Sequence, residues 1–145
     1  MARKISILGS TGSIGVNALE VIYNLKKSFE VRYLSTNKNV DLLISQIKEH
    51  KPKSVAVVDE LAAEKIKSAL DEMGIELLIG KVGLLDLSQR HDIDLVLNGL
   101  VGASGMQPTI NAIKAGVDVA LANKESLVMA GNIINKELKS SDAKL

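Results

Sequence analysis

Short apolar runs alternate with longer amphipathic segments along the whole chain. The runs are rich in Val, Ile and Leu, which favour buried β-strands. In the longer segments apolar residues recur every three or four positions, which is typical of helices that bury one face. The pattern predicts strands at residues 5–8, 30–35, 54–58, 75–79, 94–98 and 117–121, and helices from residue 14 onward and at 40–49, 60–73, 82–89, 106–114 and 125–138.

Residues with special backbone preferences fall at the predicted ends of these segments. Asn39 precedes the second helix as a candidate N-cap, and Pro52 ends it. Gly74 and Gly116 follow the third and fifth helices, where glycine commonly terminates a helix. Pro108 lies in the first turn of its helix, where proline is tolerated. The element boundaries are therefore predicted from two independent signals.

Strands that alternate with helices indicate βαβ units joined by right-handed crossovers. Apolar strands of this kind belong to a parallel sheet whose two faces are both covered. The predicted fold class is α/β, a doubly wound, Rossmann-like parallel sheet in a three-layer α/β/α arrangement. The length of 145 residues is that of one ordinary domain, so residues 1–145 are expected to form a single domain.

Composition and charge narrow the possible functions. Apolar residues make up 46% of the chain, which is enough for a sizeable core. The 18 basic and 17 acidic residues leave a net charge of +1, and the chain has one Phe, two Tyr and no Trp, so nothing indicates nucleic-acid binding. No cysteine is present, which excludes disulfides and zinc–thiolate sites. No apolar run approaches membrane-spanning length and no signal peptide is recognisable, so we expect a cytoplasmic protein.

The strongest local motif follows the first strand, where residues 9–15 read GSTGSIG. A strand, a glycine-rich turn and a helix in this order form an anion site, because N–H groups at a helix start lack partners and the dipole there favours negative charge. Gly9 allows the tight turn, Gly12 lets a diphosphate approach the backbone, and Gly15 lets helix and strand pack closely. A P-loop is excluded because no Gly-Lys-Ser/Thr follows. A plain structural turn is the alternative.

The segment after the second strand bears on the choice of dinucleotide. NAD-binding domains usually place a carboxylate there to hold the ribose hydroxyls. Here Asn37, Lys38 and Asn39 follow Thr36, and no carboxylate is present. Lys38 supplies positive charge for a 2′-phosphate, and Thr36 and Asn39 supply hydrogen bonds, so the segment favours NADP over NAD. The same residues also fit a solvated loop with a helix cap, and both descriptions can hold together.

Two further segments follow strands. Residues 98–105 contain three glycines, which would let the backbone pass close to the nicotinamide end of a cofactor or simply form turns. Residues 122–126 read ANKES, at the start of the last helix. Asn123 fits a helix cap and Glu125 favours the positive end of the dipole, whereas the cation of Lys124 opposes that dipole unless it faces an anionic ligand. Capping and ligand binding both remain open for this segment.

The remaining titratable residues indicate no further chemistry. His50 adjoins Lys51 in a helix tail and His91 lies in a polar loop, so both are predicted to be surface histidines. No cluster of carboxylates or histidines has the spacing of a metal site, and no metal ligand is predicted.

Taken together, the motifs of residues 9–15, 100–105 with Pro108 and Thr109, and 122–126 resemble those of 1-deoxy-D-xylulose 5-phosphate reductoisomerases. The similarity covers nearly the whole chain, but only the N-terminal cofactor-binding domain of that family. The Asn-Lys-Glu-Ser element is its specific part, because many reductases share the glycine motif.

The resemblance implies an NADPH-dependent enzyme of the non-mevalonate isoprenoid pathway. Such enzymes rearrange a phosphorylated deoxyketose and reduce it to 2-C-methyl-D-erythritol 4-phosphate with Mg²⁺ or Mn²⁺, usually as homodimers. By position, the resemblance assigns cofactor binding to Gly9, Thr11, Gly12, Ser13, Ile14, Gly15, Asn37, Lys38, Asn39, Asn123 and Glu125, and substrate binding to Lys124. Many members have glycine in place of Asn37, and asparagine also tolerates a left-handed backbone.

The family's metal-binding Asp-Ser-Glu element and its later domains have no counterpart here. Residues 142–145 resemble the entry into another strand. We therefore expect the chain to bind NADPH without turnover. The alternatives are another NADP-linked reductase domain and a free-standing NADP(H) sensor. An aspartate-semialdehyde dehydrogenase is disfavoured because it needs a nucleophilic cysteine.

Overall fold

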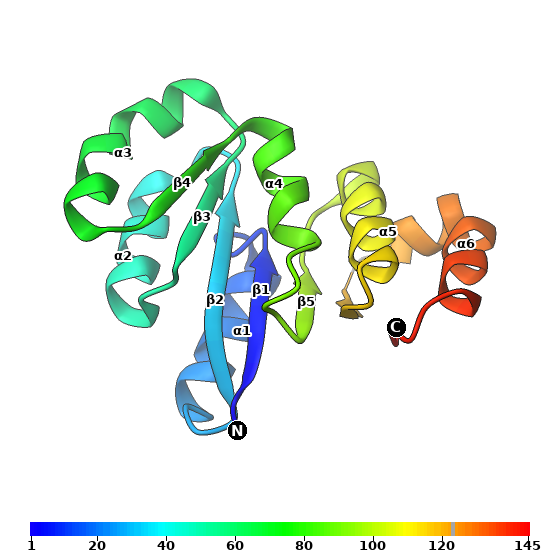
Figure 1. Cartoon of the computed structure of the whole chain (residues 1–145). Coiled ribbons are helices and arrows are strands. Elements are labelled where there is room, and N and C mark those ends of the chain that lie inside the picture. Colours follow the sequence, from blue (N-terminus) through cyan, green and yellow to red (C-terminus); the bar gives the residue numbers. More distant parts are fainter. Residues whose placement is uncertain (123) are drawn as a thin grey trace.

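The computed structural model describes residues 1–122 and 124–145. Its strands are β1 Arg3–Leu8, β2 Phe29–Thr36, β3 Ser54–Val57, β4 Glu76–Ile79, β5 Leu95–Asn98 and β6 Asp118–Leu121. Its helices are α1 Ser13–Asn24, α2 Val40–His50, α3 Glu60–Met73, α4 Gly80–Ser88, α5 Met106–Lys114 and α6 Lys124–Lys139, with a 3₁₀ turn, η1, at Gly102–Gly105 (Figure 1). The fold class and the order of the elements are as the pattern predicted.

The strands form one parallel sheet in the order β4-β3-β2-β1-β5-β6. The chain moves outward from β1 through β2, β3 and β4, and then returns to the other side of β1 with β5 and β6. The direction of winding thus reverses between β1 and β5. In doubly wound sheets this reversal opens a crevice at the carboxyl ends of the strands.

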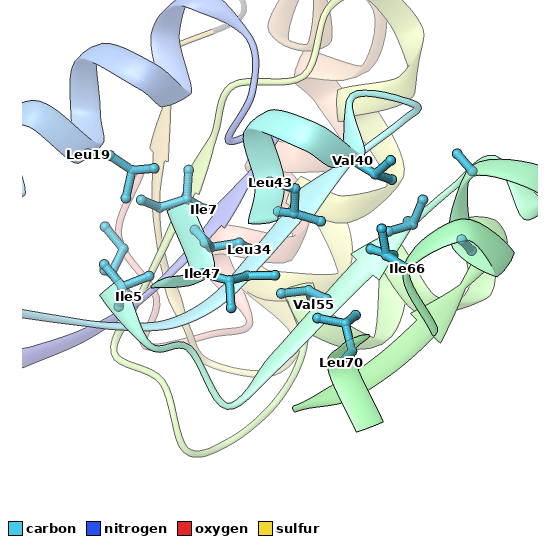
Figure 2. Close-up of a cluster of buried hydrophobic side chains, with 14 of the residues drawn as sticks. Ile5, Ile7, Leu19, Leu34, Val40, Leu43, Ile47, Val55, Ile66 and Leu70 are labelled. Carbon is cyan, nitrogen blue, oxygen red and sulfur yellow. The ribbon is translucent and has the colours of Figure 1, made fainter. Parts of the chain in front are cut away.

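Two apolar clusters, one on each face of the sheet, form the core. The alternation of side chains along a strand assigns Ile5 and Ile7 to one cluster and Leu8 to the other. The first cluster packs strands against α1, α2 and α3 with Leu19, Leu43, Ile66 and Leu70, as Figure 2 shows. The second packs strands against α4, α5 and α6 with Leu84, Leu87, Ile113 and Ile134. The sheet is therefore the middle of three layers.

Asn39 and Gly74 lie at helix ends, as the sequence predicted: Asn39 begins α2 and Gly74 ends α3. The side chain of Asn39 accepts a hydrogen bond from the N–H of Leu42 at 3.2 Å and caps α2. Gly74 ends α3 with a left-handed φ of 69°, which glycine adopts without strain.

The last residues of the chain lie beside β6. The N–H of Val119 donates to the carbonyl oxygen of Lys144 at 2.8 Å.

An ionic cluster joins α4 to the amino ends of the strands. The Arg90 guanidinium donates to Glu76 Oε2 at 3.0 Å, to Asp86 Oδ2 at 2.7 Å and to Ser54 Oγ at 3.1 Å. It also lies 4.9 Å from the ring centre of Tyr33. The hydrogen bonds from Arg90 and Ser54 hold the pKa of Glu76 below its ordinary value. The cluster fastens the edge strand β4 to the rest of the sheet.

One sequence prediction is wrong. The side chain of His50 is only 8% exposed, although His91 is exposed as predicted. His50 ends α2 and lies with Leu19 and Tyr23 of α1 around a groove between the two helices. Burial lowers its pKa, against the opposing effect of Glu49. The sequence did not indicate this burial, because His50 stands between the charged residues Glu49 and Lys51.

Candidate functional site

A cleft of about 810 Å³ lies at the carboxyl ends of β1, β2, β3 and β5, where the winding reverses. Its walls come from the glycine-rich turn, from the ends of β2 and β3, from α4, and from the segment around η1. The lining residues are Gly9, Thr11, Gly12, Ser35, Thr36, Asn37, Val58, Lys81, Leu84, Leu85, Gly99, Leu100, Val101, Ala103, Ser104, Gln107 and Pro108. The mixture of apolar side chains and small polar groups suits a ligand with an aromatic and an anionic part.

The glycine-rich turn forms one wall with its backbone. Gly9 adopts φ +77°, and Gly12 is the N-cap of α1 with no capping hydrogen bond from a side chain. A Cβ on Gly15 would lie 2.3 Å from the carbonyl oxygen of Gly9 and 2.5 Å from Cα of Ser10. The helix therefore starts directly against the turn, with its uncapped end at the cleft. Gly9 makes the tight turn and Gly15 the close packing that the motif predicted, and the approach of a diphosphate at Gly12 stays a prediction.

Strand β2 holds this turn in place. The N–H of Gly9 donates to Ser35 Oγ at 2.9 Å, and the N–H of Ser10 donates to the carbonyl oxygen of Ser35 at 2.8 Å. The hydroxyls of Thr11 and Thr36 are 2.6 Å apart and share a hydrogen bond at the cleft wall. The turn is thus tied to its neighbouring strand at three successive residues.

The loop after β2 carries the predicted 2′-phosphate residues. Asn37 lines the cleft, whereas Lys38 and Asn39 are exposed beside it. Lys38 Nζ is 3.9 Å from Asp59 Oδ2, and its side chain is 73% exposed. The other oxygen of Asp59, Oδ1, caps α3 by accepting from Ala62 N–H at 2.9 Å. Lys38 is therefore a largely exposed cation beside the cleft, and the carboxylate nearest to it also caps α3.

Buried Asn98 organises the glycine-containing segment opposite this loop. Its side-chain amide donates to the carbonyl oxygen of Gly105 and to Thr109 Oγ1, both at 2.8 Å, and accepts from the N–H of Leu100 at 3.1 Å. A Cβ on Gly105 would make tight contacts, at 3.2 Å from Ser126 Oγ and 3.3 Å from the side-chain amide of Asn98. The sequence segment predicted to pass near the cofactor does form a wall of the cleft.

The start of α6 carries the remaining predicted residues. Lys124 and Glu125 are exposed in its first turn, and Asn123 lies outside the described residues. Ser126 is fully buried, and its hydroxyl has no hydrogen-bond partner among the described residues. Of the predicted site residues, the cleft lining contains Gly9, Thr11, Gly12 and Asn37; it does not contain Ser13, Ile14, Gly15, Lys38, Asn39, Lys124 or Glu125.

Sequence reasoning missed the apolar side of the cleft. Val58 follows β3, Lys81, Leu84 and Leu85 come from α4, and Gln107 and Pro108 begin α5. The position of Val58 at the end of a strand was an available signal. The α4 residues carried none, because periodicity shows that a helix has an inner face but not which part of that face borders a cavity.

No group of three His, Asp or Glu residues in the described part of the chain is arranged to hold a metal ion. Nor does any described helix combine the length and apolar character that crossing a membrane requires.

The family model of 1-deoxy-D-xylulose 5-phosphate reductoisomerase matches residues 5–131. The chain belongs to this family. Its relatives include the reductoisomerases of Chloroherpeton thalassium, 44% identical over 99% of this chain, and of Halothermothrix orenii, 44% identical over 95%. The chain spans 37% and 36% of the length of those two proteins.

Solved structures of this reductoisomerase family agree with the fold. The enzyme from Zymomonas mobilis in complex with NADPH is 31% identical, with a TM-score of 0.93 over the whole of this chain and 38% of its own. A DOX-P reductoisomerase in complex with NADPH, fosmidomycin and magnesium is 32% identical, with a TM-score of 0.89 over 97% of this chain and 35% of its own. The fold of this chain thus matches a part of these longer proteins.

Proposed function

We propose that this chain is the NADPH-binding part of a 1-deoxy-D-xylulose 5-phosphate reductoisomerase. The observation that carries the proposal is the cleft at the switch point of the sheet, bounded by the uncapped start of α1 and by a basic loop that lacks a carboxylate of its own. An anion at a helix start gains from free N–H groups and from the helix dipole. The apolar wall of Val58, Leu84 and Leu85 has the character that an adenine ring requires.

In this assignment each wall binds one part of the cofactor. The turn and the first residues of α1, Gly12, Ser13 and Ile14, bind the diphosphate, and Lys38 with Asn37 binds the 2′-phosphate. The segment around η1 lies toward the nicotinamide end. The bound cofactor supplies a hydride, while the protein fixes its orientation and excludes water on the α4 side.

The start of α6 completes the assignment. Asn123 and Glu125 hold the ribose and nicotinamide side, and Lys124 faces the anionic substrate, which removes the conflict between its charge and the dipole. The described residues offer no ligand set for Mg²⁺ or Mn²⁺, so no step through a metal is assigned to them. In the longer protein we propose conversion of the deoxyketose phosphate to 2-C-methyl-D-erythritol 4-phosphate by a cytoplasmic homodimer.

Nucleotide titrations test the cofactor assignment. NADPH is expected to bind more tightly than NADH, measured by the fluorescence of the reduced nicotinamide. Lys38→Met should raise the Kd for NADPH about tenfold, because it removes one charge-assisted contact to the 2′-phosphate. The Kd for NADH should stay the same.

Lys48→Met is the matched control, since Lys48 is an exposed lysine in the last turn of α2, away from the cleft. It should leave both affinities unchanged. Equal affinity of the unmodified chain for the two nucleotides would contradict the NADPH assignment, and no binding of either would contradict the whole proposal.

A further inference from the structure

Gln46, a buried glutamine of α2, forms hydrogen bonds with the glycine-rich turn. Gln46 is 6% exposed, and it does not line the cleft. Its Nε2 donates to the carbonyl oxygen of Ser10 at 2.8 Å, and its Oε1 accepts from Ser10 Oγ at 2.7 Å. Both ends of one side-chain amide are thus engaged by a single residue of the turn.

These bonds fix the orientation of the peptide unit between Ser10 and Thr11. A trans peptide is planar, and its C=O and N–H point in opposite directions. Because Gln46 holds the carbonyl of Ser10 toward α2, the N–H of Thr11 is directed away from α2, on the side where Thr11 lines the cleft. A backbone donor is thereby presented at the place where a diphosphate would lie.

The rest of the turn is anchored in the same way, but from β2 instead of α2. Ser35 accepts from the N–H groups of Gly9 and Ser10, at 2.9 Å and 2.8 Å, and its carbonyl oxygen is also 3.1 Å from Ser10 Oγ. These contacts hold the nitrogen side of Ser10. The side chain of Gln46 supplies the contact to its carbonyl side.

We propose that Gln46 is a positioning residue for the diphosphate of the bound dinucleotide. It acts through the Ser10–Thr11 peptide and does not touch the ligand. This inference rests on the proposed function, because it assigns a supporting residue to the same cofactor site.

Two ligands separate this role from general damage to the fold. NADPH contains the diphosphate, whereas adenosine 2′-monophosphate keeps the adenine and the 2′-phosphate but lacks it. Gln46→Met keeps the bulk of the side chain and removes both hydrogen bonds. In calorimetric titrations it should raise the Kd for NADPH about tenfold, and that for adenosine 2′-monophosphate less than about twofold.

A second variant keeps the test decisive if Gln46→Met does not fold. Ser10→Ala adds no bulk. It removes the contacts of the hydroxyl with Gln46 Oε1 and with the carbonyl oxygen of Ser35, and it keeps the bond from Gln46 Nε2 to the carbonyl of Ser10. It should raise the Kd for NADPH about threefold with adenosine 2′-monophosphate unaffected. Where both variants fold, their double mutant should cost less than the two single changes together, since they share a contact.

Two control variants test whether the effect on NADPH binding is specific to the contact between Gln46 and Ser10. Ser45→Ala changes the exposed neighbour on α2, whose hydroxyl donates to the carbonyl oxygen of Asp41 in the same helix. Ser54→Ala removes a buried hydrogen-bonded serine at the opposite end of the sheet. Neither should change the Kd for either ligand, although Ser54→Ala should lower stability.

Unchanged NADPH binding in Gln46→Met or in Ser10→Ala would overturn the inference and leave the cofactor assignment intact. An equal loss of both ligands would also overturn it, because the effect would then be general. If the unmodified chain bound neither ligand, the proposed function would fail, and this inference with it.

Discussion

Gly15 shows how strictly one position can depend on having no side chain. The nearest atoms to a Cβ at this position belong to the backbone of Gly9 and Ser10, which cannot rotate away. Gly15→Ala is therefore expected to separate α1 from the turn, to lower the free energy of unfolding by about 2 kcal/mol or more, and to abolish NADPH binding. Denaturant unfolding and nucleotide titration measure the two effects.

Gly131 in α6 provides the matched comparison. Gly131 follows Ala130, whose φ of −133° and ψ of 20° kink α6. Apart from the adjoining residues and the backbone of its own helix, no described atom lies within 4 Å of a Cβ built on it, so Gly131→Ala should change stability by less than about 1 kcal/mol. A loss of stability as large as that of Gly15→Ala would mean that backbone crowding is not the cause.

His50 makes stability depend on pH. Burial lowers its pKa in the folded chain, so the unfolded chain, with the ordinary value of 6.5, takes up a proton first as the pH falls. The contribution of His50 is complete above pH 6.5 and decreases as the pH falls below it. His50→Gln should flatten the decline in unfolding free energy between about pH 7 and pH 5.

His91→Gln serves as the control for this pH dependence, because His91 is exposed. It should keep the slope of the unmodified chain. Parallel slopes for the unmodified chain and His50→Gln would show that other groups account for the dependence.

At the scale of elements, the cluster around Arg90 secures α4 and β4 to each other. Arg90→Met keeps the aliphatic stem and removes the donors to Glu76, Asp86 and Ser54, so we expect a loss of about 2 kcal/mol in unfolding free energy. NADPH binding should persist, since the cluster lies at the amino ends of the strands. Urea unfolding with and without NADPH measures both.

The exposed pair of Arg3 and Asp118, 3.0 Å apart, offers a contrast. Arg3→Met should cost less than about 1 kcal/mol, as is usual for a surface ion pair. If both arginine variants lost the same small amount, the network around Arg90 would have no special stability.

The bounds of an element were predicted well where a capping residue or a glycine adjoined a segment with a regular hydrophobic period. The third helix was predicted at 60–73 and is found at Glu60–Met73, between its Asp59 cap and Gly74. The 3₁₀ turn at Gly102–Gly105 was not predicted, because small residues leave no hydrophobic period. The contacts of Gln46 with Ser10 were missed for another reason: the two residues are 36 positions apart, and only the folded sheet brings them together.

At the scale of the whole molecule, we expect this chain to bind the cofactor without catalysing the reaction. The described residues contain no cluster of three His, Asp or Glu side chains that could hold a metal ion, and the chain spans just over a third of its relatives' length. The 145-residue chain should therefore bind NADPH but oxidise it only at the background rate with the deoxyketose phosphate and Mn²⁺. Absorbance at the nicotinamide band follows the reaction. The control is a full-length family member assayed in parallel, and measurable turnover by the short chain would contradict the prediction.

The family and the fold were recognisable from the sequence because the motifs lie at fixed places on one sheet. All the predicted cofactor and substrate contacts, from Gly9 to Glu125, stay predictions, since their roles depend on a ligand and not on the fold. The apolar wall from Leu84 and Leu85 emerged only from the packing of α4 against the sheet.

Helix α1 has Gly12 as its N-cap, and no described side chain caps its first turn. A phosphate group seated there would do for this helix what Asn39 does for α2. The bound nucleotide would then stabilise the folded chain. Well above the Kd, the free energy of unfolding would rise with the logarithm of the nucleotide concentration.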